Sequence, residues 1–149
     1  MKVLIALDGS PCSKKAVEFA ADRAWHADDS FLVLSVLEPM PHELGYGDAD
    51  LEAEALAERA AHREADCETL VDEAREILAA KHPELKIDKK VVRGLAVDAI
   101  ISMAEQLGIG LIIVGSHGRK GLEKFLVGSV AERILHQAPC AVEIVKHHG

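Results

Sequence analysis

The chain has 149 residues, of which 49% are hydrophobic, and it carries a formal net charge of −8 at pH 7. This length is typical of one domain, here residues 1–149, that can bury a core without disulfides. The acidic charge argues against a nucleic-acid surface. No apolar run approaches the roughly 18 residues that a membrane span needs, so we expect no membrane association and a cytoplasmic location.

The cysteines give no sign of a disulfide framework or a zinc site. Cys12, Cys67 and Cys140 are widely spaced, their number is odd, and no CxxC pair occurs. We expect three small, buried hydrophobic side chains in a reducing compartment.

The first half of the chain begins with two near-continuous apolar runs, 3–8 and 31–37. Runs of this kind are typical of strands that are buried on both faces. Ser10 suits a helix N-cap and Pro11 suits the first helical position. Apolar residues then recur at helical spacing and predict a helix over 11–27.

Proline and glycine mark a loop at 38–50, and a long acidic helix is predicted over 50–81. The second half of the chain continues the alternation of strands and helices. The strand expected at 86–92 is polar, as an edge strand should be. The elements expected after it are a helix at 96–107, a strongly apolar strand at 110–115, a helix at 129–137 and a strand at 140–146.

Strands that alternate with helices predict an α/β fold with a doubly wound parallel sheet and helices on both faces. The first and fourth strands are the most apolar, so we expect them to form the central pair. Ligands of such sheets bind beyond the carboxyl ends of the strands, at the switch point where the strand order reverses. Here those ends are Asp8-Gly9-Ser10 and Gly115-Ser116-His117-Gly118.

Glycines gather around this predicted switch point. Gly115 and Gly118 follow the fourth strand, and Gly128 with Ser129 begins the last helix. Backbone amides without side chains can approach an anion closely, and a helix N-terminus carries a partial positive charge. Together with the cations Arg119 and Lys120, this pattern predicts a phosphate site. The alternative is that the glycines only make turns.

Other motifs for phosphate binding or catalysis do not fit. Gly110 and Gly115 have the glycine spacing of GxxxxGK[ST], but Ser116 stands where lysine is needed. GxGxxG does not follow the first strand, and neither GxSxG nor HExxH occurs. Ser116 and His117 could form a nucleophile and its base, but adjacent residues at a strand end point apart. We therefore predict no catalytic residue and no metal ligand.

The spacing Gly115-x2-Gly118-x9-Gly128-Ser129 resembles the nucleotide-binding signature of the universal stress proteins. The segments VLIALDGS, VLSVLEP, VVRG, LIIVGSHGR and PCAVEIVK also follow the order of that family, so the resemblance covers essentially the full length. It implies a Rossmann-like domain of the ATP-binding subgroup, with a five-stranded sheet in the order 3-2-1-4-5 and dimeric assembly.

The resemblance also implies an adenine-nucleotide site for ATP or AMP, with Mg²⁺ or Mn²⁺ held mainly by the phosphates. Its contacts divide into two groups. Those to adenine and ribose would come from Ala6, Asp8, Val36, Val114 and Gly115. Those to the phosphates would come from Gly118, Arg119, Gly128, Ser129 and Val130.

These implications favour a stress-response regulatory protein that binds ATP and is read by an unknown protein partner. A slow ATPase of the same fold and a nucleotide-independent dimeric interaction protein are the alternatives. The last strand supports a dimer on physical grounds, because residues 141–145 are apolar on both faces apart from Glu143. An apolar strand at a sheet edge invites pairing, so we expect Ala141–Val145 to pair with its twin in a homodimer.

Overall fold

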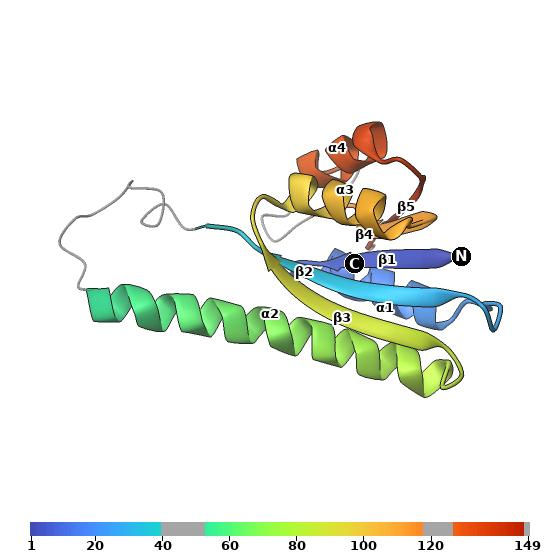
Figure 1. Cartoon of the computed structure of the whole chain (residues 1–149), viewed down its shortest axis with the longest axis horizontal. Helices are drawn as coiled ribbons and strands as arrows, with labels where there is room; N and C mark the ends of the chain where they lie inside the picture. Colours follow the sequence, from blue (N-terminus) through green and yellow to red (C-terminus); the bar gives the residue numbers. More distant parts are fainter. Residues whose placement is uncertain (40–52, 118–126, 148–149) are drawn as a thin grey trace.

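The structure is a computed structural model that describes residues 1–39, 53–117 and 127–147. Strands and helices alternate through these residues (Figure 1). The elements in chain order are β1 (Lys2–Leu7), α1 (Pro11–Ala21), β2 (Ser30–Leu37), α2 (Ala53–Lys81), β3 (Lys86–Arg93), α3 (Ala96–Leu107), β4 (Leu111–Gly115), α4 (Ser129–Gln137) and β5 (Ala141–Val145).

The strands form one parallel sheet in the order β3-β2-β1-β4-β5. This confirms the predicted order, and β1 and β4 are indeed neighbours at the centre. The polar β3 lies at one edge and the apolar β5 at the other. The order in which successive strands are added to the sheet reverses between β1 and β4, so the switch point lies where it was predicted.

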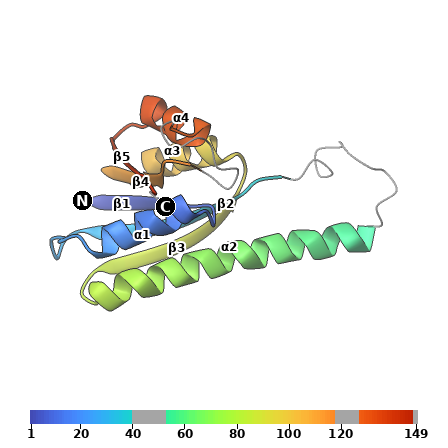
Figure 2. The same cartoon turned by 180° about the vertical axis from the view of Figure 1, so that it is seen from behind.

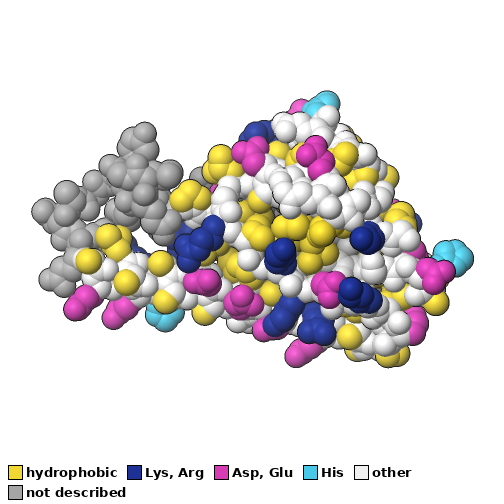
Figure 3. All heavy atoms as spheres, viewed as in Figure 1, with side chains coloured by type: hydrophobic (Ala, Val, Ile, Leu, Met, Phe, Trp, Pro, Cys, Tyr) yellow, Lys and Arg dark blue, Asp and Glu magenta, His cyan; other side chains and the backbone are white. Residues whose placement is uncertain are grey.

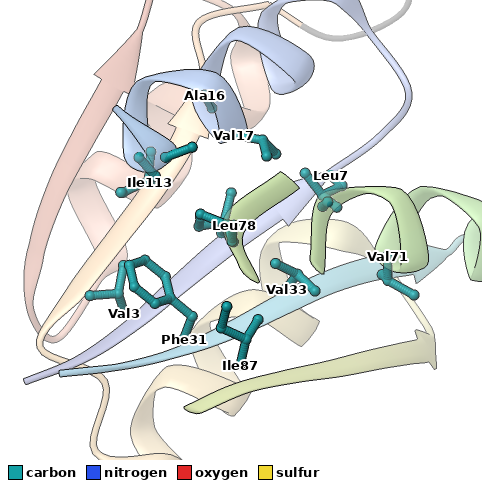
Figure 4. Packing of buried hydrophobic residues seen from close by; sticks show 14 of the residues in the cluster. Val3, Leu7, Ala16, Val17, Phe31, Val33, Val71, Leu78, Ile87 and Ile113 are labelled. Carbon is teal, nitrogen blue, oxygen red and sulfur yellow. The ribbon is translucent and has the colours of Figure 1, made fainter. Parts of the chain in front are cut away.

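Helices cover both faces of the sheet, α1 and α2 on one and α3 and α4 on the other (Figures 1 and 2). Successive side chains of a strand point to opposite faces, so each buried strand contributes to two cores. In β1, Val3 and Ile5 belong to the core under α1 and α2, whereas Leu4 belongs to the core under α3 and α4. Figure 4 shows the first core, with Leu78 of α2 among the side chains of the sheet.

The long helix α2 is anchored mainly by its second half. Its buried residues are Val71, Ala74 and Leu78, and its first half extends past the sheet (Figures 1 and 2). Figure 3 shows acidic side chains along α2 and Lys and Arg side chains gathered near β3. Lys89 pairs with Asp72 across this boundary, so charges supplement the apolar contacts there.

The helix α1 ends at Ala21, so the prediction of a helix over 11–27 was wrong at its C-terminal end. The physical reason is Trp25. Its indole Nε1–H donates to the Ala20 carbonyl at 2.8 Å, and its ring packs edge to face on Phe31 with the centroids 4.8 Å apart. Placing the partly buried indole there requires the chain to leave the helix.

The expectation of three buried cysteines is correct only for Cys12. Cys67 and Cys140 are partly exposed, and all three thiols are free. Burial nevertheless raises the pKa of the Cys140 thiol. The predicted first residues of the long helix, 50–52, lie outside the described residues. In the part that the structure describes, no helix has the length and hydropathy of a membrane span.

Candidate functional site

The two central strands part toward their carboxyl ends. β1 pairs with β4 only over Val3–Ile5 and Leu111–Ile113, although each strand continues for two more residues. Over those last residues β1 pairs with β2, and β4 pairs with β5. Beyond Ile5 and Ile113 the two central strands are therefore no longer paired with each other, and this lies at the switch point, where sheets of this kind bind their ligands.

The turn after β1 is built by three consecutive residues. Gly9 has a φ of 80°, which a residue with a side chain rarely adopts. The Asp8 carboxylate accepts a hydrogen bond from the Ser10 amide at 2.9 Å. The Ser10 hydroxyl accepts one from the Ser13 amide at 3.2 Å, so Ser10 is the predicted N-cap of α1 and Pro11 begins the helix.

A hydrogen bond and close packing hold the start of α1 against the end of β4. The Ser10 hydroxyl also donates to the His117 carbonyl at 3.2 Å. A Cβ placed on Gly115 would lie 2.7 Å from both the carbonyl carbon and the Cβ of Cys12. Only glycine at this position lets the first turn of α1 pack so closely on β4, a reason that the sequence pattern did not provide.

The start of α4 is held against the same strand end. The Gly128 amide donates to the Ser116 carbonyl at 2.6 Å, and a Cβ on Gly128 would lie 2.8 Å from that carbonyl oxygen. Gly128 is the N-cap of α4, and no side chain of the described residues caps this helix. Ser129 and Val130, at the first two helical positions, are exposed. Among the described residues, no side chain uses the hydrogen-bonding capacity of their amides.

The expectation that Ser116 and His117 point apart is wrong. The Ser116 hydroxyl lies 3.0 Å from Nδ1 of His117, at hydrogen-bond distance. The chain has already left β4 at Gly115, so the alternation of a strand no longer applies. The Ser116 hydroxyl also lies 3.6 Å from the Cys12 sulfur, which brings three reactive side chains into contact.

The structure brings most of the predicted site residues to the switch point. Ala6 lies near the end of β1 and is followed by Asp8, while Val114 and Gly115 end β4. Gly128, Ser129 and Val130 form the start of α4 beside them. Val36 lies one strand away, paired with Val92 of β3 and partly buried. Gly118 and Arg119 lie outside the described residues, and the roles of all ten remain predictions.

One structural role near this edge of the sheet was missed in the sequence. Glu38 follows β2, and its carboxylate accepts a hydrogen bond from the Ala96 amide at 2.9 Å. It therefore caps α3, whose own N-cap position holds Leu95 and has no side-chain cap. A leucine at an N-cap position is the signal that could have indicated a cap from elsewhere in the chain.

The fold places this chain among the parallel α/β domains, a class whose ligand sites lie at the switch point. The sequence model of the universal stress protein family matches residues 1–146. Universal stress protein A homolog 1 of Coxiella burnetii is 33% identical over 143 residues, which cover 94% of this chain and 92% of the relative. Universal stress protein MJ0531 of Methanocaldococcus jannaschii is 31% identical over 150 residues, covering 97% and 81%. The chain belongs to the universal stress protein family.

Solved structures show the same fold. Protein MJ0577 of Methanocaldococcus jannaschii superposes with a TM-score of 0.73 at 22% identity, covering 99% of this chain and 96% of the other. A universal stress protein in complex with cAMP has a TM-score of 0.69 at 23% identity, covering 98% and 96%. An Arabidopsis thaliana member with AMP bound has a TM-score of 0.65 at 17% identity, covering 100% and 93%.

Proposed function

We propose that this protein binds an adenine nucleotide at the switch point and acts as a regulatory module of the stress response. The observation that carries the proposal is the separation of β1 and β4 after Ile5 and Ile113, right beside the start of α4, which no side chain of the described residues caps. The parted strand ends can receive the nucleoside, and the start of a helix can receive an anion. A nucleotide contains both a nucleoside and an anionic phosphate.

The phosphates belong at the start of α4. The amides of Ser129 and Val130 lie in its first turn, where the helix dipole adds a partial positive charge. The Ser129 hydroxyl can donate one more hydrogen bond. The Gly128 amide already donates to Ser116, so the contribution of Gly128 is to bring the helix close rather than to donate.

The adenine and ribose belong at the parted strand ends. Ala6 and Val114 lie there with small or apolar side chains, and Asp8 provides a polar group for the ribose. The family members solved with AMP and with cAMP support an adenine nucleotide as the ligand class. For this chain we propose ATP or AMP.

A divalent ion would be held mainly by the phosphates themselves. Among the described residues, no group of three or more His, Cys, Asp and Glu side chains could hold a metal. Mg²⁺ in nucleotide sites is commonly bound through substrate phosphates and few protein groups, so Mg²⁺ or Mn²⁺ suits this site without a protein cage. The ion would neutralise phosphate charge when ATP is the ligand.

The regulatory output would be a change read by a protein partner in the cytoplasm. We propose a single domain that works as a homodimer, joined through Ala141–Val145 of β5. This strand pairs with β4 on one side and is the last in the sheet, so its other edge is available to a second copy.

Isothermal titration calorimetry with adenosine, AMP and ATP–Mg²⁺ tests the proposed ligand. We expect AMP and ATP to bind the protein more tightly than adenosine does, because the phosphates contact the start of α4. Ser129→Pro is the sharpest variant. Proline is favoured at the first helical position, and the preceding Gly128 already has an extended conformation. The variant therefore keeps the helix while removing one amide and the hydroxyl.

Ser129→Ala is the matched control, because it removes the hydroxyl and keeps the amide. We expect Ser129→Pro to weaken AMP binding about tenfold, since a hydrogen bond to a charged group contributes roughly 1.5–3 kcal/mol, and Ser129→Ala to weaken it less. Equal affinity for adenosine and AMP in the unaltered protein would contradict a phosphate site. Phosphate release from ATP over hours would instead support the slow ATPase.

A further inference from the structure

A chain of three side chains connects α1 to the end of β4. The Cys12 sulfur lies 3.6 Å from the Ser116 hydroxyl oxygen, and that oxygen lies 3.0 Å from Nδ1 of His117. Cys12 and Ser116 are buried, with 7% and 1% of their surface exposed. The second ring nitrogen of His117, Nε2, is also buried and has no hydrogen-bond partner among the described residues.

The chemistry of this chain sets the direction of its hydrogen bonds. The Ser116 hydroxyl has a single proton to donate, and an imidazole nitrogen is a far better acceptor than a thiol sulfur. In the arrangement that uses the better acceptor, the hydroxyl donates to Nδ1 of His117 and the Cys12 S–H can donate to the hydroxyl oxygen. A neutral imidazole that accepts at Nδ1 carries its proton on Nε2, so the buried, unpartnered atom is a donor.

The backbone around His117 is held from two sides. Its carbonyl accepts from the Ser10 hydroxyl, and the Ser116 carbonyl accepts from the Gly128 amide at the start of α4. The backbone of His117 is thus held at the strand end beside which the phosphate is expected. A buried donor left unpaired is costly, and an anion beside it would remove that cost.

We infer that Nε2–H of His117 donates to a phosphate of the bound nucleotide, and that Cys12 and Ser116 are positioning residues that fix its tautomer. The inference rests on the proposed function. It adds a side-chain donor to the helix amides that are expected to contact the phosphate. The chemistry recognised is a phosphate oxygen, which a nucleotide or free inorganic phosphate could supply.

Calorimetry with adenosine, AMP and inorganic phosphate tests the role of His117. His117→Phe removes both ring nitrogens, and we expect it to weaken AMP binding about tenfold while leaving adenosine binding within about twofold. His117→Gln can place an amide N–H near the position of Nε2, so it should recover part of the loss. His136→Gln, the same substitution on an exposed histidine of α4, should change neither affinity. Inorganic phosphate alone should bind far more weakly than AMP.

The outcomes separate this inference from the function it rests on. If the unaltered protein binds AMP no better than adenosine, the phosphate site itself fails. If it does bind AMP better, and both His117→Phe and His117→Gln keep that preference, the inference alone is overturned. If inorganic phosphate matches AMP, the ligand is a free anion and the nucleotide assignment fails.

Nitrogen NMR of the His117 ring at pH 8, where neutral imidazole is the common form of histidine, tests the positioning by Ser116. We expect the free protein to carry its proton on Nε2 and that resonance to move when AMP is added. Ser116→Ala should mix the two tautomers without unfolding the protein. A proton on Nδ1 in the free protein would overturn the inference.

Discussion

Gly115 is the residue at which sequence pattern and structure give different reasons for the same amino acid. The pattern pointed to a close approach of ligand to backbone. The structure shows that a Cβ would collide with the backbone of Cys12 at 2.7 Å. The glycine therefore has a packing role between β4 and α1 that does not depend on a ligand.

Gly115→Ala is accordingly expected to destabilise the protein without nucleotide. Overpacking of one methyl group against backbone costs about 1–3 kcal/mol, because the first turn of α1 must move away from β4. Urea unfolding of the ligand-free protein measures this change. A variant as stable as the original would show that Gly115 is kept only for ligand binding.

The residue-level predictions that succeeded depended on local chemistry. Ser10 and Pro11 could be assigned to the start of α1 because N-caps and first-turn prolines act within a few residues. The contact of Ser116 with Cys12 joins residues 104 positions apart in the sequence. Nothing in the local pattern of either segment indicates that contact.

At the scale of elements, α2 is a long helix fixed by a short buried stripe. Val71, Ala74 and Leu78 are the buried residues among its 29, and Leu78 is fully buried in the core of Figure 4. The sequence predicted this helix because the apolar period is strong in its second half. It could not predict the end of α1, because that end depends on Trp25 packing against Phe31 of another element.

Leu78→Ala should therefore destabilise the protein strongly. Removing a fully buried leucine costs about 2–5 kcal/mol through lost burial and the cavity left behind. Leu107→Ala in α3 is the matched control, since Leu107 is 39% exposed. Thermal unfolding of both variants should show a large decrease in midpoint for Leu78→Ala and a small one for Leu107→Ala. Equal decreases would mean that α2 is not anchored at Leu78.

At the scale of the whole molecule, the apolar composition of the first and fourth strands indicated the central pair, whereas the full order 3-2-1-4-5 came from the resemblance to the universal stress proteins. The polar β3 and the last strand β5 lie at the edges as expected. The pairing of two copies in a dimer cannot be predicted in this way, because strand composition and order describe only the packing within one chain. The proposed dimer through β5 therefore needs its own test.

The direction of the backbone groups in β5 decides which variant is informative. The Val145 carbonyl accepts from the Ser116 amide on the β4 side. Because the N–H and C=O groups of successive residues alternate in direction, the backbone groups of Glu143 also point toward β4. The Glu143 side chain pairs with Arg23. The groups of Val142 and Ile144 face the free edge, so a proline there removes an outward N–H.

Val142→Pro should convert the proposed dimer to a monomer in analytical ultracentrifugation. Val142→Ala is the control, because it trims the side chain and keeps the N–H, and it should remain a dimer. Circular dichroism would verify that both variants are folded. A dimer that persists in Val142→Pro, or an unaltered protein that sediments as a monomer, would contradict pairing through β5.

We propose that the parted ends of β1 and β4 and the start of α4 together bind one nucleotide. A crystal structure of the protein grown with AMP measures this most directly. We predict the adenosine between the ends of β1 and β4, with the phosphate within hydrogen-bond distance of the Ser129 and Val130 amides. Nucleotide bound elsewhere, or a phosphate directed away from the start of α4, would contradict this binding site.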